Sequence, residues 1–445
     1  MSDFPLISHA GQDAPFAYRA GRAIPVGRFL RDVEALAQRL PDQPHILNLC
    51  ADRYRFAVGF AAALRRGQTS LLPPNYTADF VARLVRRYPG TYCLTDGAAE
   101  FPGVEVMSFP ELGADAGAAA AEQVPRLPAA QRAALVFTSG STGDPVPHEK
   151  TWGSLCKGAA AEAASLGIEP GSGTVLLGTV PAQHMYGLES SMLLAMQNGL
   201  ALVAERPFYP ADICAQLAAL PPPRCLVTTP VHLRTLLSEA TQLPAVQFVL
   251  CATAHLAPQL ALEAEARFAA PLYEIYGCTE AGMAASRRTT QGAAWSLLPG
   301  VGMVRDELGC RVHGGHVEIE ARLSDEIECR PDGTFVLHGR TSDMVNIAGK
   351  RTSLASLNHH LNAIPGVQDG AFFMPDDGDG AVRRPLAFVV APGLRSEDIL
   401  AALRNSVDAV FLPRPLCFVE ALPRNATGKI TREALQQLMA RHVKK

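Results

Sequence analysis

A short segment rich in hydroxyl residues and glycine is the strongest candidate for chemistry in this chain. Directly after the apolar stretch 133–136 it reads Thr138-Ser139-Gly140-Ser141-Thr142-Gly143. Glycines let the backbone turn so that several N–H groups can face one anion, and Ser and Thr hydroxyls add small donors. The pattern favours a phosphate-binding loop, although such clusters are also typical of ordinary solvated loops. It is not a Walker loop, because the Gly-x-x-x-x-Gly-Lys pattern is missing.

Further candidate residues follow in order along the chain, several of them at the ends of expected strands. They are His184, Thr253, Ala254, Tyr276, Gly277, Thr279, Glu280, Asp325, Arg340 and Lys429. Taken singly, each has an ordinary structural explanation. An isolated His or Tyr usually belongs to a core, and an isolated carboxylate or lysine usually belongs to a solvated surface.

The elements that must position these residues alternate between strands and helices. From residue 133 to about 280, the sequence predicts strands at 175–177, 201–203, 225–227 and 248–250, and helices at 190–197, 210–220 and 230–237. Residues 45–72 predict strand, helix and strand, and the Ala-, Gly- and Pro-rich stretch 112–131 predicts a surface connection. Alternation of this kind predicts an α/β architecture with largely parallel sheets, whose ligands bind at the carboxyl ends of strands.

The pattern changes in the last third of the chain. Short β-type segments at 317–319 and 334–337 predict a β-rich subregion. After Arg340, strands are expected at 371–373, 386–390 and 416–419, and helices are expected after Ser396, taken as an N-cap, and after Thr431. We therefore predict a large N-terminal domain over 1–340 and a small α+β domain over 341–445.

Composition excludes several classes of protein. The 445 residues carry a formal net charge of −3 with dispersed Lys and Arg, so no nucleic-acid-binding surface is indicated. The ten cysteines include no Cys-x-x-Cys pair, which is typical of buried thiols in a reducing compartment. No secretory signal and no apolar run of about 20 residues occurs, so we expect a cytoplasmic protein without a membrane span.

In this order, the segments resemble the motifs of the adenylate-forming superfamily, which contains acyl-CoA synthetases, nonribosomal-peptide adenylation domains and luciferases. The resemblance covers nearly the whole chain. It includes Tyr276-Gly277-Cys278-Thr279-Glu280, then Asp325 at the family's spacing from Gly339-Arg340, then Thr427-Gly428-Lys429. It implies an AMP-forming ligase that uses ATP and Mg²⁺, and a small mobile C-terminal domain with a hinge at Ser342.

The resemblance also implies roles in nucleotide binding. The loop 138–143 would hold the β- and γ-phosphates, Tyr276 would stack on adenine, and Asp325 would accept the ribose hydroxyls with Arg340 nearby. Three further residues would bind the nucleotide: Thr253, Ala254 and Gly277.

Catalytic roles are implied in the same way. Lys429 would reach from the small domain to the α-phosphate and the substrate carboxylate. Glu280 and Thr138 would bind Mg²⁺, a cation that prefers oxygen ligands. Thr279 would contact the α-phosphate, and His184 would lie between the acyl and nucleotide sites.

The chain departs from the family pattern at three places. Val146 stands where the family's loop usually has a lysine, and Lys150 follows four residues later. Lys150 either replaces that lysine or is a surface residue at a helix start. Ala252-Thr253 replaces Gly-Gly in the adenine loop, and Asn346 replaces a lysine that often assists thioester formation.

A finer resemblance concerns the acid and its acceptor. The short length and the loop variant resemble ligases of xanthomonadin and aryl-polyene pigment clusters, which load an aryl acid such as 4-hydroxybenzoate or a hydroxycinnamate onto an acyl carrier protein. The acceptor would be a phosphopantetheine thiol, on holo-carrier protein or coenzyme A. The small acid would bind near Met185, Gly187, Cys278 and Met283.

Alternatives remain open from the sequence. They are a medium- or long-chain acyl-CoA synthetase, a luciferase-type oxygenase, and a non-catalytic adenylate-binding protein on the same fold. The apolar or small residues expected around the acid suit aryl and medium-chain acids alike. The protein would be a monomer or a homodimer.

Overall fold

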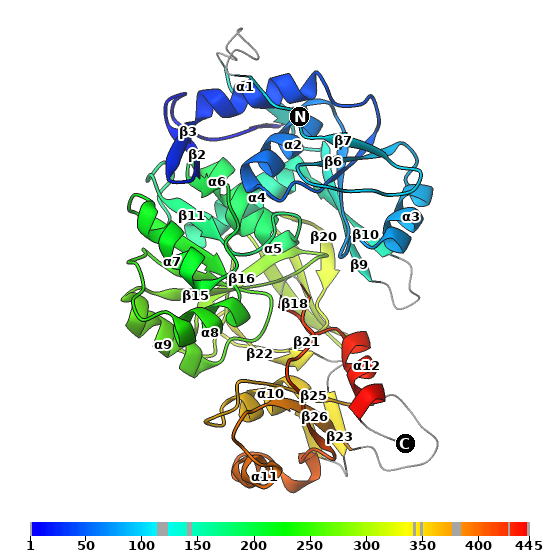
Figure 1. Ribbon diagram of the computed structural model, residues 1–445, viewed down its shortest axis with the longest axis vertical. Helices are drawn as coiled ribbons and strands as arrows, with labels where there is room; N and C mark the ends of the chain where they lie inside the picture. Colours follow the sequence, from blue (N-terminus) through cyan, green and yellow to red (C-terminus); the bar gives the residue numbers. More distant parts are fainter. Residues whose placement is uncertain are drawn as a thin grey trace.

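The protein has a large N-terminal domain of layered sheets and helices and a smaller C-terminal domain, which lies at the lower end of the view (Figure 1). The computed structural model describes residues 2–113, 123–139, 145–340, 344–347, 350–375, 384–425 and 428–442. No helix within these ranges is long and apolar enough to cross a membrane. The predicted fold class is confirmed. The predicted boundary after residue 340 stays a prediction, because residues 341–343 lie outside the described ranges.

The first large sheet contains six strands in the described part of the chain. In spatial order they are β10 (Pro145–Thr151), β9 (Arg132–Ser139), β5 (Thr69–Leu72), β4 (His45–Asn48), β6 (Thr91–Thr95) and β7 (Glu105–Ser108). All neighbours pair in parallel except β10, which folds back on β9 as a hairpin. The carboxyl end of β9, at Ser139, therefore lies at the edge where parallel sheets bind ligands.

The second large sheet contains nine described strands. In spatial order they are β17 (Ser296–Leu297), β16 (Gly282–Arg288), β15 (Leu272–Cys278), β14 (Val249–Cys251), β13 (Arg224–Thr228), β11 (Val175–Gly178), β12 (Ala201–Val203), β2 (Pro15–Arg19) and β3 (Arg22–Pro25). The run from β15 through β12 to β2 is parallel, and both edges end in antiparallel pairs. The strand predictions at 175–177, 201–203, 225–227 and 248–250 are confirmed.

Helices cover these sheets, and sequence signals mark their starts. They are α1 (Val26–Ala37), α2 (Arg53–Arg65), α3 (Ala78–Arg87), α4 (Trp152–Ser165), α5 (Met185–Gly187), α6 (Leu194–Asn198), α7 (Pro210–Ala219), α8 (Pro230–Glu239) and α9 (Pro258–Phe268). Asp52 caps α2 by accepting a hydrogen bond from the Arg55 N–H, and Thr229 caps α8 ahead of a proline in its first turn. The predicted helix at 190–197 instead begins as the π-helix η1 (Leu188–Leu193).

A fully buried arginine joins the two large sheets. Arg53, in the first turn of α2, donates from Nη2 to the carbonyl oxygens of Gly178 and Val180 at 2.9 and 2.8 Å. Its Nη1 donates to the carbonyl oxygens of Val203 and Glu205 at 2.9 and 3.2 Å. Burial lowers the pKa of Arg53 to about 10. The guanidinium thus holds the chain segments that follow β11 and β12.

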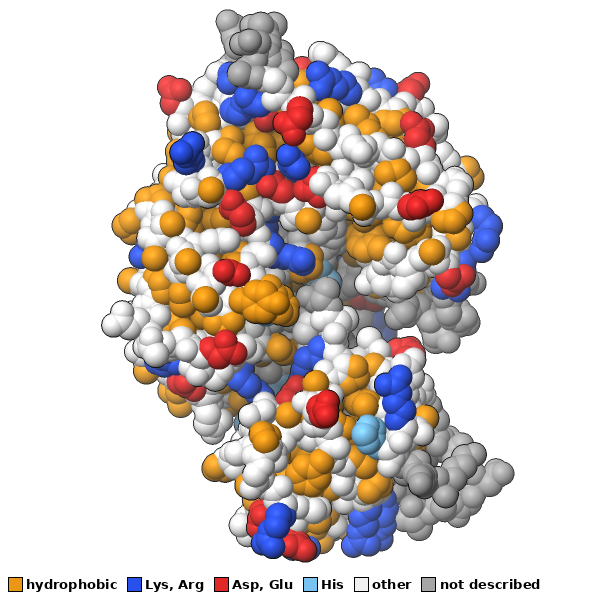
Figure 2. Space-filling view, viewed as in Figure 1, with side chains coloured by type: hydrophobic (Ala, Val, Ile, Leu, Met, Phe, Trp, Pro, Cys, Tyr) orange, Lys and Arg blue, Asp and Glu red, His pale blue; other side chains and the backbone are white. Residues whose placement is uncertain are grey.

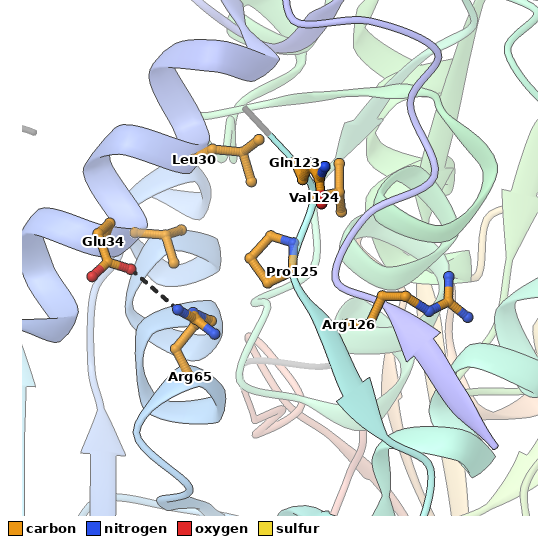
Figure 3. A pocket seen from close by; sticks show the side chains of 8 residues that line it. Leu30, Glu34, Arg65, Gln123, Val124, Pro125 and Arg126 are labelled. Atoms are coloured by element: carbon orange, nitrogen blue, oxygen red, sulfur yellow. Dashed lines mark hydrogen bonds and ion pairs between the residues drawn. The ribbon is translucent and has the colours of Figure 1, made fainter. Parts of the chain in front are cut away.

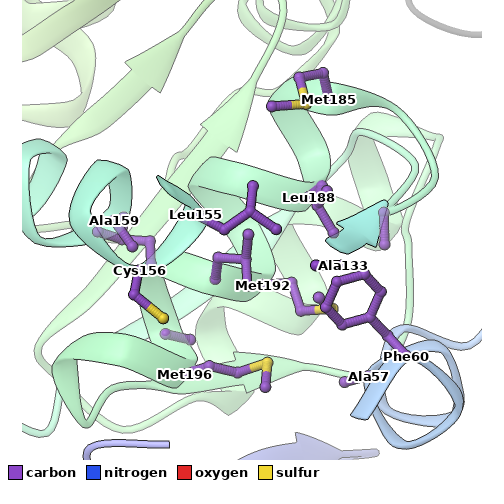
Figure 4. Close-up of a cluster of buried hydrophobic side chains, with 14 of the residues drawn as sticks. Ala57, Phe60, Ala133, Leu155, Cys156, Ala159, Met185, Leu188, Met192 and Met196 are labelled. Carbon is purple, nitrogen blue, oxygen red and sulfur yellow. The ribbon is translucent and has the colours of Figure 1, made fainter. Parts of the chain in front are cut away.

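The π-helix η1 packs into the centre of the N-terminal domain. Figure 4 shows its Met192 lying beside Leu155 and Cys156 of α4. Met185 and Leu188 belong to the same buried cluster. Because a π-helix has wider turns than an α-helix, η1 changes the directions in which its side chains point. Side chains at its start therefore lie near the ends of β15 and β16, as described below.

Smaller sheets complete the N-terminal domain. They are β1 (Asp3–Pro5) with β8 (Arg126–Pro128), the meander β18 (Gly302–Asp306), β19 (Gly309–Gly314) and β20 (Val317–Arg322), and the hairpin β21 (Asp325–Cys329) and β22 (Phe335–Arg340). The β-rich subregion is as predicted. The stretch 112–131 is more ordered than predicted at its end, because β8 pairs with β1 and buries Leu127; residues 114–122 lie outside the described ranges.

The C-terminal domain has its own cores. Its elements are β23 (Met344–Ile347), β24 (Lys350–Ser353), α10 (Leu354–Asn362), β25 (Asp369–Phe373), β26 (Leu386–Val390), α11 (Ser396–Arg404), β27 (Leu416–Phe418) and α12 (Arg432–His442). Adjacent strand residues point to opposite faces, so Phe372 packs with α10 and α11 while Phe373 packs with Leu438 of α12. The prediction of Ser396 as an N-cap is wrong. Arg395 is the N-cap, because Asp398 accepts a hydrogen bond from the Arg395 N–H at 3.0 Å.

The two domains touch along α8. Arg234 of α8 donates to the carbonyl oxygen of Gln368 at 2.8 Å. Gly428 approaches Val231, whose Cγ2 would lie 3.2 Å from a Cβ at that glycine. Figure 2 shows the smaller domain set off from the larger one by a deep notch on one side, with Lys, Arg, Asp and Glu side chains interspersed on this face. The contacts bring the C-terminal loop that carries Lys429 to the N-terminal domain.

Candidate active site

The predicted phosphate loop connects β9 and β10. Gly140, Ser141, Thr142 and Gly143 lie outside the described residues, as does the side chain of Ser139, so phosphate binding there stays a prediction. The half-buried Thr138 is described, and its Oγ1 lies 3.0 Å from Nε2 of His148 on the facing strand. One residue predicted as a metal ligand is therefore held by a histidine that the sequence did not single out.

His148 links that hydroxyl to the predicted metal-binding carboxylate. Its Nε2 lies 3.7 Å from Oε1 of Glu280. Burial lowers the pKa of His148, while Glu280 raises it and Lys150 lowers it. Residues two apart in a strand share a face, so Val146, His148 and Lys150 point the same way from β10. This alternation is the signal that could have drawn attention to His148.

Lys150 is not a surface residue at a helix start, so that alternative is wrong. It belongs to β10, is 6% exposed, and donates from Nζ to the carbonyl oxygen of Glu280 at 2.8 Å. Burial lowers its pKa, and nearby Glu189 and Cys278 raise it. Lys150 thus stabilises the backbone at Glu280 through this hydrogen bond. Whether it also replaces the missing lysine on the phosphate loop stays open.

Tyr276 and Asp325 form a pair, although 48 residues separate them in the sequence. The Tyr276 hydroxyl donates to Oδ2 of Asp325 at 2.7 Å. The half-buried Tyr276 ring packs against Trp295 and Phe335, with centroids 5.7 and 5.9 Å away. Arg340 lies directly opposite Asp325 in the β21–β22 register, and its side chain is outside the described part. The predicted adenine and ribose residues are thus adjacent, and their roles stay predictions.

Several predicted residues line one cavity of about 110 Å³. From the N-terminal domain they are His184, Thr253, Gly277 and Thr279. Lys429 of the C-terminal domain lines it too. The further described lining residues are Met185, Tyr186, Glu189, Ala252, Ile275, Cys278, Gly282 and Met283. Of the four acid-pocket residues expected from the sequence, only Gly187 is missing from this wall.

Glycine is required behind the wall at residue 187. A Cβ at Gly187 would lie 1.9 Å from the carbonyl oxygen of Pro181, which no rearrangement of a side chain could relieve. Thr253 is not a glycine, yet it adopts φ +84°, a left-handed conformation that is unusual for a β-branched residue. Its neighbour Ala254 is half-buried and does not line the cavity. The residues that replace the family's Gly-Gly therefore retain a glycine-like backbone at Thr253.

The pKa of His184 lies below its ordinary value. Burial, with a smaller contribution from Lys429, lowers its pKa to about 4. Its Nδ1 is buried and makes no hydrogen bond to any described residue. A ligand in the cavity could therefore satisfy this atom.

The loop that carries Lys429 is fixed from both sides. The Lys429 N–H donates to Oδ1 of Asn425 at 2.9 Å, and Arg424 donates to the carbonyl oxygen of Gly428 at 2.6 Å. Arg424 in turn forms an ion pair with Asp369 at 2.7 Å. Gly428, at φ +78°, lets the backbone turn beside Val231. These contacts therefore fix the backbone at Lys429, whose side chain lines the cavity.

The oxygen donors present suit a magnesium ion. The Thr138 hydroxyl and the Glu280 carboxylate both lie close to Nε2 of His148, and the carboxylate is 42% exposed. Mg²⁺ usually takes one or two protein oxygens and completes its shell with water and substrate phosphates. The described residues hold no cluster of three or more His, Cys, Asp or Glu that could bind a metal by itself. A metal here would thus be one shared with a phosphate substrate.

A second hollow of about 370 Å³ lies away from these residues, between α1 and the segment 123–126 (Figure 3). An ion pair between Glu34 and Arg65, 3.4 Å apart, stands at its edge. None of the residues predicted from the sequence to act in catalysis or binding lines it. The cavity that contains Lys429 is therefore the candidate active site.

The fold and this arrangement define an adenylate-forming enzyme. Residues 28–319 match the AMP-binding enzyme family, and residues 358–429 match the AMP-binding enzyme C-terminal domain. The chain belongs to the AMP-binding enzyme family.

Individual proteins are similar over most of the chain. The 4-coumarate–CoA ligase of Rhodobacter capsulatus is 30% identical over 300 residues, which cover 66% of this chain and 74% of that protein. The o-succinylbenzoate CoA synthetase of Bacillus subtilis, solved with its acyl-adenylate intermediate, has a TM-score of 0.82 at 18% identity and covers 98% of this chain and 99% of its own. ATP-bound MatB from Rhodopseudomonas palustris has a TM-score of 0.81 at 18% identity, covering 97% of both chains.

Proposed function

We propose that this protein is an ATP-dependent acid–thiol ligase that joins a compact aryl acid, such as 4-hydroxybenzoate or a hydroxycinnamate, to a phosphopantetheine thiol. In the first half-reaction, the acid carboxylate attacks the α-phosphorus of ATP, pyrophosphate leaves, and an acyl-adenylate forms. In the second, the thiol sulfur attacks the acyl carbon and AMP leaves. Membership of the AMP-binding enzyme family supports this chemistry, and similar folds bind ATP and an acyl-adenylate.

One observation carries the proposal: a lysine of the C-terminal domain enters a cavity that the N-terminal domain builds. Lys429 shares that cavity with Thr279 and His184. Two anions must meet when a carboxylate attacks a phosphate, and a fixed cation lowers the energy of that encounter. A compact ammonium group on a flexible stem suits a charge that must also withdraw afterwards. The hydrogen bonds of Arg424 with Gly428 and of Lys429 with Asn425 supply that placement.

Magnesium would be held by Glu280 and Thr138, where it would neutralise charge on the phosphates. His148 lies within hydrogen-bond distance of Thr138 and beside Glu280, so it is placed to orient both side chains. The phosphate loop 138–143 would hold the β- and γ-phosphates. Tyr276 and Asp325 would bind the nucleoside, since their hydrogen bond fixes both side chains at one place.

The size and lining of the cavity favour a compact acid. Its volume of about 110 Å³ is small beside the ~300–1,000 Å³ of sites for drug-sized ligands. Met185, Ile275 and Met283 give it apolar walls. A compact ring acid needs less room than a long acyl chain, which counts against the medium- and long-chain alternative.

For the second half-reaction, we propose that the domain after residue 340 turns about Ser342 and exposes the adenylate to the thiol. A carrier protein is the proposed acceptor because the variant segment 147–152 resembles that of carrier-protein ligases. Two of the similar proteins above, the 4-coumarate–CoA ligase and the o-succinylbenzoate CoA synthetase, are instead named for coenzyme A. Asn346 and Gly349, expected near the thiol path, lie outside what is described of side chains.

The experiment is ATP–pyrophosphate exchange over a panel of aryl and fatty acids, followed by thioester formation on coenzyme A and on holo-carrier protein, read by mass spectrometry. We expect exchange with hydroxylated aryl acids and thioester on the carrier protein. Background exchange across the whole panel would refute the ligase proposal and favour the non-catalytic alternative. Thioester on coenzyme A alone would correct the acceptor.

A further inference from the structure

One carboxylate on the cavity wall has no part in adenylation chemistry. Among the described lining residues, Glu189 is the one acidic side chain, and it is only 6% exposed. It stands near the start of the π-helix η1. The cation that acts on Glu189 is Lys150, whereas the cation that acts on His184 is Lys429. Glu189 and His184 therefore line the same cavity beside different lysines.

The Glu189 carboxylate is held in position by its neighbours. A Cβ at Gly282 would lie 2.8 Å from its Oε1, so the absence of a side chain there makes room for the carboxylate. Gly282 also adopts φ +80°, where glycine is favoured. The backbone N–H of Met283 donates to Glu189, and Lys150 is itself fixed by its bond to the Glu280 carbonyl. Several contacts thus fix the position of the Glu189 carboxylate in the cavity wall.

A buried carboxylate destabilises the folded protein unless hydrogen bonds or an opposite charge compensate for its lost hydration. Burial raises the pKa of Glu189 to about 7 in spite of Lys150 and the Met283 N–H. Met185 and Met283 beside it show that an apolar side chain would suit the local packing. A few placed polar groups on an apolar wall are what fixes a ligand's orientation in small-molecule sites. This pattern points to a ligand group as a further partner of the carboxylate.

Resting on the proposed function, we propose that Glu189 selects the acid substrate: it accepts a hydrogen bond from a hydroxyl or amino group at the end of the ring remote from the reacting carboxylate. The substrate class is then a hydroxy- or amino-substituted aryl acid. With Lys429 and Thr279 at the carboxylate end, the ring fills the apolar middle and its donor reaches Glu189. An acid without a donor places its apolar ring edge against the buried carboxylate and forms no hydrogen bond with it, which is a basis for rejection.

The test uses ATP–pyrophosphate exchange with matched acids: 4-hydroxybenzoate and 4-aminobenzoate against benzoate, and 4-hydroxycinnamate against cinnamate. We expect the wild-type protein to favour the donor-bearing member of at least one pair by more than 100-fold in kcat/KM. Glu189→Met should reduce that preference to less than about 10-fold, mostly by improving use of the unsubstituted acid. Glu189→Gln, which keeps an acceptor oxygen, should retain a preference between these two values.

Glu162→Gln is the matched control, because Glu162 is a neighbouring buried carboxyl that does not line the cavity. It should leave the preference unchanged. Equal use of both members of every pair by the wild-type protein, or an unchanged preference in Glu189→Met, would overturn the role of Glu189 and leave the ligase intact. Exchange at background with every acid would refute the ligase and this inference together. If Glu189→Met does not fold, the wild-type ratios and Glu189→Gln decide.

Discussion

Replacing Arg53 by Met is expected to destabilise the N-terminal domain by about 3 kcal/mol, because four buried carbonyl oxygens lose a donor. Four carbonyl oxygens, of Gly178, Val180, Val203 and Glu205, receive its hydrogen bonds at 2.8–3.2 Å. Each buried carbonyl left without a donor costs about 1 kcal/mol or more. The variant no longer buries a charged guanidinium, a burial that lowers the pKa of Arg53 to about 10. This gain in stability offsets part of the loss.

Urea unfolding followed by tryptophan fluorescence measures this change. Both tryptophans of the chain, Trp152 and Trp295, are buried in the N-terminal domain, so the signal reports that domain alone. Arg55→Met is the control on the same helix. Its ion pair with Glu111 is loose, at 3.8 Å with a 97% exposed carboxylate, so a loss below about 1 kcal/mol is expected. Equal losses in the two variants would refute the reasoning.

Three further changes have expected outcomes. Lys429→Ala should lower adenylation by about 10²–10³-fold while calorimetric ATP binding survives; exchange at the wild-type rate would contradict its role. His148→Ala should lower exchange about 10-fold and raise the Mg²⁺ requirement, measured by magnesium titration, and an unaltered requirement would count against it. Burial raises the pKa of Glu162 from 4.5 to about 8, so the folded state keeps a proton that the unfolded state loses, and stability falls as pH rises through that window. In urea unfolding, Glu162→Gln should therefore gain stability relative to wild type between pH 5 and pH 8.5, and a constant difference would contradict this.

Local pattern predicted the strands well, because a buried parallel strand is a continuous apolar run that few other structures produce. Residues 133–137 are all buried in β9, as their composition indicates. The N-cap at Ser396 failed because propensity favours Ser, whereas a hydrogen bond from the Arg395 N–H to Asp398 fixed the start one residue earlier. Local preferences of this size are easily outweighed by one well-placed side chain.

The site was predictable where a motif fixed a residue, and not where only packing did. The cavity brings together His184, Thr279 and Lys429 from distant segments, which the order of the motifs had indicated. Glu189 gave no such signal, because one carboxylate in an apolar helical stretch reads as a surface charge. Its burial depends on Gly282, nearly a hundred residues away in the chain. Side-chain pairs across separate elements need the fold before they can be recognised.

The wide turn at Leu188–Leu193 has a consequence for how related chains diverge. Removing one residue from this stretch would convert it to a regular α-helix and rotate position 189 by about 100° relative to α6. The buried contacts of Met192 with α4 could persist while a different side chain came to face the cavity (Figure 4). A change in length, with no change of residue type, can therefore exchange the group that meets the acid. Relatives aligned without a gap here would be compared at positions that do not correspond in space.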